Sequence, residues 1–256
     1  MSEHAEPGWT LVTGASRGIG LATAQRLFAA GHRVVIWSRS TPVRQDWLTD
    51  AERDGVLIHQ QVDVSNESNV DSALLDLRRR GFGLNNLILN AGSGRWTALH
   101  AVSTAEWRET LGVNLDGAFF LLKRLLPTLC QADAPLVVAV LSDSVLYPFA
   151  ERAAYSAAKA GLRALLETTR LEFRPHGVRF SLLYPSRVDT HFAGSHATGR
   201  PGLRPGSLKA DDIAETIAFI MALPPRVEIR EVHMASRSSS FGPFGEKLDE
   251  HSDRKA

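Results

Sequence analysis

Tyr155 and Lys159 form the residue pair in this sequence with the clearest potential for chemistry. They begin and end the run Tyr-Ser-Ala-Ala-Lys, and on a helix this spacing places the phenol and the ammonium on one face. An adjacent ammonium stabilises a phenolate, so we expect the pKa of Tyr155 to move from about 10 toward neutrality. Such a tyrosine can give and take protons, but the same spacing also occurs on ordinary solvated helices.

Composition excludes several classes of function. The chain has 256 residues, of which 44% are hydrophobic, and its 29 basic residues nearly balance 28 acidic ones. This balance gives no electrostatic support for binding nucleic acid or an anionic membrane. Cys130 is the one cysteine, so no internal disulfide can form, which suits a reducing cytoplasm. Residues 1–8 lack an apolar signal core, and no apolar run reaches the about 18 residues of a membrane span.

A glycine-rich turn stands near the N-terminus. An apolar run over 9–13 predicts a strand, the turn Thr-Gly-Ala-Ser-Arg-Gly-Ile-Gly covers 13–20, and helical spacing follows. In this arrangement glycines let the backbone approach a pyrophosphate, which then sits on the helix N-terminus. The sequence therefore predicts a dinucleotide site, against the simpler alternative of a plain strand-to-helix turn.

Two arginines indicate which dinucleotide binds. Residues 33–37 predict a second strand, and Arg39 lies 19 residues after Gly20, where an NAD-binding unit carries an acid for the ribose. Arg39 and Arg17 could instead form ion pairs with a 2′-phosphate, although Arg39 could also be a solvent-facing charge. We therefore expect NADP(H) to be preferred over NAD(H).

Polar or small residues follow the next two predicted strands. Residues 56–62 precede Asp63, which could cap the turn or meet an adenine amino group, and Ser65 is the expected N-cap of a helix that ends at Arg80. Residues 84–89 precede Asn-Ala-Gly over 90–92, where the backbone could lie against a ribose. These strand ends extend the expected cofactor site.

The second half of the chain supplies the remaining candidates for catalysis. A helical stretch over 104–129 holds Asn114 in its interior, where we expect a buried, hydrogen-bonded and functional asparagine. An apolar strand over 136–141 delivers Ser142, 13 residues before Tyr155. The expected helix over 152–174 carries the tyrosine and stops at a proline.

The last third repeats the alternation. We expect a strand over 178–184, a helix over 211–223 and a strand over 227–234. The loop over 191–207 holds four glycines and two prolines and is predicted to be a substrate lid, and 236–256 is a polar tail. Alternating strands and helices predict one α/β domain over 1–256: a Rossmann-type doubly wound sheet of seven mainly parallel strands with helices on both faces. The carboxyl ends of its strands would bring the candidate residues to one rim.

Over 9–234 the chain resembles the short-chain dehydrogenase/reductase family of the classical type. The motifs that carry the resemblance are the turn over 13–20, Asp63, Asn-Ala-Gly over 90–92, Asn114, Ser142, Tyr155 and Lys159. The resemblance implies NAD(P)-dependent interconversion of an alcohol and a carbonyl. It makes Tyr155 the acid/base, Lys159 the ribose ligand that lowers its pKa, Ser142 the residue that orients the substrate oxygen, and Asn114 the holder of a relay water.

The expected ligand contacts follow from the turn, the strand ends and the resemblance. Expected cofactor contacts are Gly14, Ser16, Arg17, Gly18, Ile19, Gly20, Ser38, Arg39, Asp63, Val64, Asn90, Ala91, Gly92, Tyr155, Lys159, Pro185, Val188 and Thr190. Expected substrate contacts are Ser93, Arg95, Trp96, Ser144, Phe149, Arg187, His191 and Phe192.

Three positions depart from the family pattern. Ser186 replaces the usual glycine after Pro185 and could narrow the nicotinamide pocket, Leu89 replaces an asparagine, and the family's glycine-rich ending is absent after Met234.

We expect a small carbonyl or alcohol substrate. We also expect a homotetramer or homodimer, because two long helices carry surplus apolar residues. The alternatives are a non-catalytic NADP-binding sensor or scaffold, and a metal-dependent hydrolase. The nine histidines form no compact ligand cluster, so no metal is expected.

Overall fold

The computed structural model describes residues 8–192, 201–202 and 206–238. Its centre is one seven-stranded sheet in the order β3-β2-β1-β4-β5-β6-β7, and all six neighbouring strand pairs are parallel. The strands are β1 (Trp9–Thr13), β2 (Val34–Ser38), β3 (Leu57–Gln61), β4 (Leu84–Leu89), β5 (Leu136–Val140), β6 (Arg179–Pro185) and β7 (Glu231–Met234). Strand order reverses between β1 and β4, which is where a doubly wound sheet binds its ligand.

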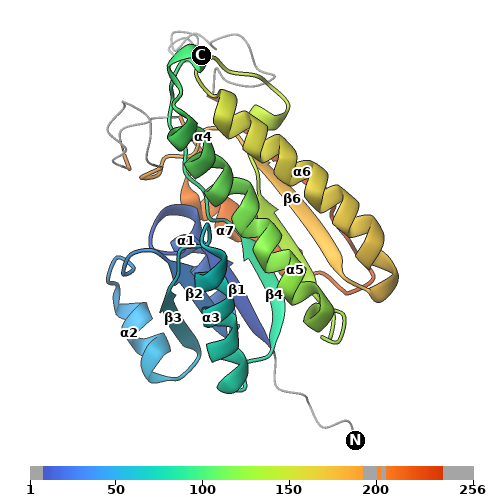
Figure 1. The fold of residues 1–256 in the computed structure, drawn as a ribbon. Coiled ribbons are helices and arrows are strands. Elements are labelled where there is room, and N and C mark those ends of the chain that lie inside the picture. The colour runs from blue at the N-terminus through green and yellow to red at the C-terminus, as the bar shows by residue number, and fades with distance from the viewer. Residues whose placement is uncertain (1–7, 193–200, 203–205, 239–256) are drawn as a thin grey trace, which may run out of the picture.

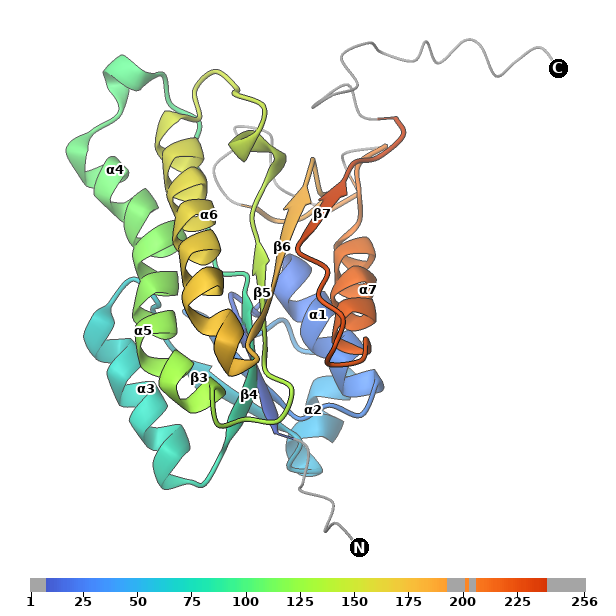
Figure 2. The same ribbon diagram turned by 90° about the vertical axis from the view of Figure 1, so that its right-hand side faces the viewer.

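Helices cover both faces of this sheet (Figures 1 and 2). The helices are α1 (Gly18–Ala29), α2 (Asp46–Arg53), α3 (Glu67–Arg79), α4 (Thr104–Leu111), α5 (Gly117–Leu129), α6 (Ala153–Phe173) and α7 (Ala210–Met221). One hydrophobic cluster joins the sheet to α3, α5 and α6, and a second joins it to α1, α2 and α7. Strands β1, β2, β5 and β6 are buried throughout because both of their faces pack against helices. The predicted fold class is confirmed.

Several boundaries differ from those expected. Helix α2 was not predicted, and the last strand covers 231–234 rather than 227–234. Residues 228 and 229 still follow β6, but the Glu228 carboxylate accepts from the Phe180 amide and the Ile229 carbonyl accepts from the Ser181 hydroxyl. Side chains thus replace the regular strand pairing there.

The long helix predicted over 104–129 is continuous but irregular. Between α4 and α5 the segment η2 (Gly112–Asp116) forms a π-helical turn, and Asn114 lies inside it. A π turn shifts the hydrogen-bond ladder by one residue and frequently marks a functional site. The predicted lid and tail fall largely on 193–200, 203–205 and 239–256, which lie outside the described residues.

Candidate active site

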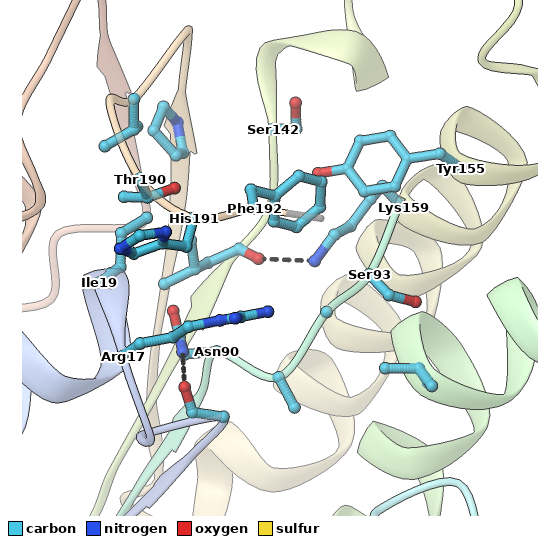
Figure 3. A pocket seen from close by; sticks show the side chains of 18 of the residues that line it. Arg17, Ile19, Asn90, Ser93, Ser142, Tyr155, Lys159, Thr190, His191 and Phe192 are labelled. Carbon is cyan, nitrogen blue, oxygen red and sulfur yellow. Dashed lines mark hydrogen bonds between the residues drawn. The ribbon is translucent and has the colours of Figure 1, made fainter. Parts of the chain in front are cut away.

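A cavity of about 540 Å³ opens at the carboxyl ends of the strands. Figure 3 labels ten of its lining residues, with Arg17 and Asn90 at one end and Ser142, Tyr155 and Lys159 at the other. All expected cofactor contacts line it except Gly20, Asp63 and Val64. The sheet therefore gathers residues that are far apart in the sequence around one space.

The glycine turn is held against the end of β4. Asn90 Nδ2 donates to the carbonyls of Thr13 and Gly14 at 2.9 and 3.2 Å, and the Thr13 hydroxyl accepts from the amides of Asn90 and Ala91. Gly14 has a φ of +68°, and a Cβ there would lie 2.8 Å from the Ala91 Cα. A Cβ on Gly20 would lie 2.5 Å from Asn90 Nδ2, so this glycine supports the turn from behind rather than lining the cavity.

Arg17, Ser38 and Arg39 line the cavity beyond the glycine turn. The Ser38 hydroxyl donates to the Ser40 carbonyl at 2.7 Å and lies 3.1 Å from His59 Nε2. Side chains and backbone amides at this end can therefore meet an anion, and no acidic residue of the described chain lines this part of the cavity.

Asp63 has a structural contact of its own. Its carboxylate accepts from the Ser65 amide at 3.0 Å and from the Ser65 hydroxyl at 2.7 Å. The expectation that Ser65 caps the following helix was wrong: Asn66 is the N-cap of α3, and its side chain accepts from the Asn69 amide. The Ser65 hydroxyl instead donates to Asp63.

Tyr155 and Lys159 project from α6 into the same end of the cavity (Figure 3). Only 7% of Tyr155 and 3% of Lys159 is exposed, and Lys159 Nζ donates to the Val140 carbonyl at 2.9 Å. Burial raises the pKa of Tyr155 to about 12 and lowers the pKa of Lys159 to about 8. The sequence-based expectation of a lowered tyrosine pKa is therefore reversed, because desolvation outweighs the Ser142 hydrogen bond and the Arg152 charge, which lower the pKa.

Ser142 follows β5 and lies next to the phenol. It is 8% exposed, and a hydrogen bond between the Ser142 and Tyr155 hydroxyls opposes the rise in the Tyr155 pKa. The Ser142 hydroxyl also donates to Asp143 Oδ1 at 3.2 Å and accepts from the Ser144 amide at 3.2 Å. This serine thus stands between the phenol and a carboxylate.

Asn114 lies behind this group, where the π turn places it. Its Nδ2 donates to the carbonyls of Ser93 at 2.7 Å and Thr110 at 2.9 Å, and its Oδ1 is buried without a hydrogen-bond partner. A Cβ on Gly92 would lie 3.0 Å from that oxygen and 3.6 Å from Lys159 Nζ. Asn114 was thus expected to be buried and hydrogen-bonded, and it is; its unsatisfied acceptor faces the space shared with the lysine.

Aromatic rings enclose the substrate end. The Tyr155 ring makes edge contacts with Trp96 and Phe192, with centroids 5.6 and 5.8 Å apart. The Arg152 guanidinium lies 4.2 Å from the Trp96 ring centroid and 4.6 Å from that of Phe149.

A tight turn holds this wall in place. Glu151 adopts a left-handed φ of +64°, and its carbonyl accepts from the Thr97 amide at 2.9 Å. This bond ties the segment that carries Trp96 to the residue before Arg152. The left-handed backbone of a glutamate has a conformational cost, which the tie helps to offset.

Six of the eight expected substrate contacts line the cavity: Ser93, Trp96, Phe149, Arg187, His191 and Phe192. Arg95 points elsewhere and pairs with Glu109 at 3.2 Å, while Ser144 is buried outside the lining. Asp143 and Arg152 line the cavity and were missed, although they directly follow Ser142 and precede α6. The available signal was their position in the sequence, next to Ser142 and to the start of the helix that carries Tyr155.

Comparison with known proteins identifies the family. The family model for short chain dehydrogenase matches residues 8–200. The chain belongs to the short-chain dehydrogenase family. As a member of that family it is an oxidoreductase, and the match covers β1 to β6 and all the residues that line the cavity.

Relatives of this short-chain dehydrogenase include two proteins that were solved with an NADP-type ligand. Dehydrogenase/reductase SDR family member 11 of Bos taurus is 29% identical, covering 88% of this chain and 94% of that protein. An alcohol dehydrogenase from Thermococcus sibiricus, solved with 5-hydroxy-NADP, superposes with a TM-score of 0.80 at 31% identity, covering 91% and 97% of the two chains. A metagenomic short-chain oxidoreductase solved with NADP superposes with a TM-score of 0.72 at 31% identity, covering 89% and 96%.

Within 8–192, 201–202 and 206–238, no group of three or more His, Cys, Asp or Glu side chains could hold a metal ion. Over the same residues, no helix has both the length and the apolar content needed to cross a membrane.

Proposed function

We propose that this short-chain dehydrogenase is a single-domain NADP(H)-dependent oxidoreductase that interconverts a carbonyl and a secondary alcohol. The observation that carries the proposal is the convergence of Tyr155, Ser142 and Lys159 at one end of a cavity whose other end is the glycine turn. The cavity thus combines a proton donor, a hydroxyl that can orient an oxygen and an ammonium with a turn of the kind that binds a dinucleotide.

The residues fit the cofactor on structural grounds. A Cβ on Gly14 would collide with the Ala91 backbone, so the glycine lets the turn lie tightly against the end of β4, and the turn leads into the N-terminus of α1. When bound, NADP(H) would supply or accept the hydride. Gly14, Ser16, Gly18, Ile19, Asn90, Ala91 and Gly92 would hold its pyrophosphate and ribose, and Pro185, Val188 and Thr190 its nicotinamide.

The preference for NADP(H) is supported by charge. Arg17 and Arg39 line the end of the cavity beyond the glycine turn, and Ser38 lies with them. A guanidinium presents parallel N–H donors that match a phosphate, so these arginines favour a ribose 2′-phosphate. NADP in two relatives of similar sequence gives independent support.

In the proposed reaction Tyr155 is the acid that protonates the oxygen of a substrate carbonyl. Its raised pKa keeps the phenol protonated near neutral pH, which favours this direction. The Lys159 ammonium then stabilises the phenolate that forms. Ser142 donates a second hydrogen bond to the same oxygen, so charge that develops there meets two donors.

We propose that Asn114 helps to restore the proton. Its buried, unpartnered Oδ1 can hold a water next to Lys159, and that water would link the lysine to solvent. The π turn supports this role, because it holds Asn114 beside Gly92, behind the cavity lining, with its Nδ2 fixed by two carbonyls.

We also propose that the protein assembles into a homotetramer or homodimer in the cytoplasm. Trp107 on α4, Phe119 on α5 and Leu171 on α6 are between 36% and 64% exposed, on the side of the sheet that α5 and α6 cover. Such residues favour an apolar contact between copies.

Residues 191–207 remain our candidate lid, since the described part places His191 and Phe192 in the cavity wall.

The proposal is tested with a panel of ketones, aldehydes, quinones and acyl thioesters. Consumption of NADPH is followed for the wild-type protein and for Tyr155→Phe. We expect one class to be reduced, and the variant to bind NADPH with little change while losing at least about a hundredfold in rate. Reduction that survives in Tyr155→Phe would overturn the assignment.

A further inference from the structure

Asp143 is a carboxylate at the substrate end of the cavity for which the proposed mechanism has no use. It opens the short helix η3 (Asp143–Val145) directly after Ser142 and is 8% exposed. It lines the cavity together with Trp96, Phe149 and Arg152. A buried carboxylate is costly unless it is paired or hydrogen-bonded, so its partners are informative.

Two donors and one charge act on this carboxylate. The Ser142 hydroxyl donates to Oδ1 at 3.2 Å, and the nearby Ser144 amide and the positive charge of Arg152 both favour the ionised form of the carboxylate. Burial acts in the opposite direction and raises the pKa of Asp143. An ionised carboxylate offers about four acceptor sites, so this residue of the cavity lining keeps acceptor capacity beyond the Ser142 bond.

The hydrogen bond from Ser142 conflicts with its proposed role. A serine hydroxyl has one hydrogen, which cannot point at Asp143 and at a substrate oxygen together. A substrate with no donor of its own would have to draw that hydrogen away from a carboxylate. A substrate that donates to Asp143 would compensate the carboxylate for the hydrogen bond it loses when Ser142 turns to the substrate oxygen.

The charge of Arg152 limits what that donor can be. The guanidinium lies between the Trp96 and Phe149 rings and acts on both Asp143 and Tyr155. Its positive charge favours the ionised carboxylate and would repel an ammonium brought to the same place. A neutral hydroxyl is the donor that this pair accepts at least cost.

We propose that Asp143 is a specificity-determining residue that binds a hydroxyl on the carbon next to the reacting carbonyl. The substrate class is then α-hydroxy ketones, and vicinal diols in the reverse direction. Binding of that hydroxyl to Asp143 leaves Ser142 free to donate to the carbonyl oxygen. This inference rests on the proposed carbonyl–alcohol chemistry and narrows its substrate class.

A matched pair of aryl ketones tests the inference. α-Hydroxyacetophenone and propiophenone differ by a hydroxyl in place of a methyl group, and the aromatic ring suits the wall of Trp96, Phe149 and Phe192. The measurement is the ratio of kcat/KM for the two ketones with NADPH. It is compared among the wild-type protein, Asp143→Ala, Asp143→Asn and the control Asp133→Ala, which removes an exposed carboxylate before β5.

The expected result for Asp143→Ala is a crossover. Its kcat/KM should fall roughly ten- to hundredfold on the hydroxy ketone, the loss of a hydrogen bond to a charged group. On propiophenone it should rise by about fivefold, because Ser142 no longer donates to a carboxylate. Asp143→Asn keeps an acceptor without the charge, so its ratio should fall between the wild-type and alanine values, and Asp133→Ala should keep the wild-type ratio.

Equal loss on both ketones would overturn the inference, and so would an unchanged ratio in both Asp143 variants. If the alanine variant does not fold, the asparagine variant decides alone, since its near-identical shape preserves packing. Failure of the wild-type protein to reduce either ketone, or any of the panel above, would instead overturn the proposed function. The two failures are therefore distinguishable.

Discussion

The charge on Lys159 should set the alkaline limit of carbonyl reduction. Burial lowers the pKa of this lysine to about 8, whereas the Tyr155 phenol stays protonated to about 12. The lysine is then about nine-tenths charged at about pH 7 and about one-tenth charged at about pH 9. Because the ammonium stabilises the phenolate that forms, reduction should fall roughly tenfold per pH unit above about pH 8.

Stability should change in the opposite direction over this range. The folded lysine has a lower pKa than the unfolded one, so between about pH 8 and about pH 10.5 the unfolded state binds more protons. Unfolding therefore becomes harder with rising pH as far as this group is concerned. A loss of activity over the same range would therefore not be explained by unfolding caused by deprotonation of Lys159.

The assay is the pH dependence of kcat/KM for a good ketone, measured for the wild-type protein, Lys159→Arg and the control Lys123→Arg. An arginine stays charged over this whole range, so Lys159→Arg should react more slowly but should not show the fall in kcat/KM above about pH 8. Lys123 is exposed, and the control Lys123→Arg should keep that fall. A limb that persists in Lys159→Arg, or a wild-type profile that is flat to about pH 10, would refute the reasoning.

Two further predictions concern the cofactor and the assembly. Arg39→Asp should weaken NADPH binding by roughly ten- to hundredfold and leave NADH binding little changed, since only NADPH carries the phosphate; isothermal titration measures both, and equal affinity of the wild-type protein for NADH and NADPH would contradict the assignment. Light scattering at micromolar concentration should give a multiple of 28.0 kDa, and Phe119→Lys should lower it if α5 lies at the contact; a wild-type mass of one chain would contradict the proposed oligomer.

The sheet and most of the cavity could be predicted from the sequence, because short apolar runs each end in a polar or small residue. Parallel strands place such ends on one rim, so Gly14, Asn90, Ser142 and Pro185 could be brought together without coordinates. Asn114 could be singled out as a poor helix residue. Its π turn could not be predicted, because that turn depends on packing against Ser93.

The electrostatics of the site could not be predicted. Helical spacing correctly places Tyr155 and Lys159 on one face, but the pKa of each follows from burial, which depends on the loops over the site. Asp143 and Arg152 lie between regular elements, where periodicity carries no information. Their proximity follows from the turn at Glu151 and the stacking on Trp96, both of which are tertiary contacts.

Hydride transfer itself gives the most direct test of the proposed function. NADPH deuterated at the hydride-bearing carbon of the nicotinamide is incubated with the best ketone and with the wild-type protein or Tyr155→Phe, and the alcohol is examined by mass spectrometry and NMR. The account predicts deuterium on the carbinol carbon for the wild-type protein, and little or none for the variant although it still binds NADPH. Deuterium transfer by Tyr155→Phe at the wild-type rate, or an unlabelled alcohol from the wild-type protein, would contradict it.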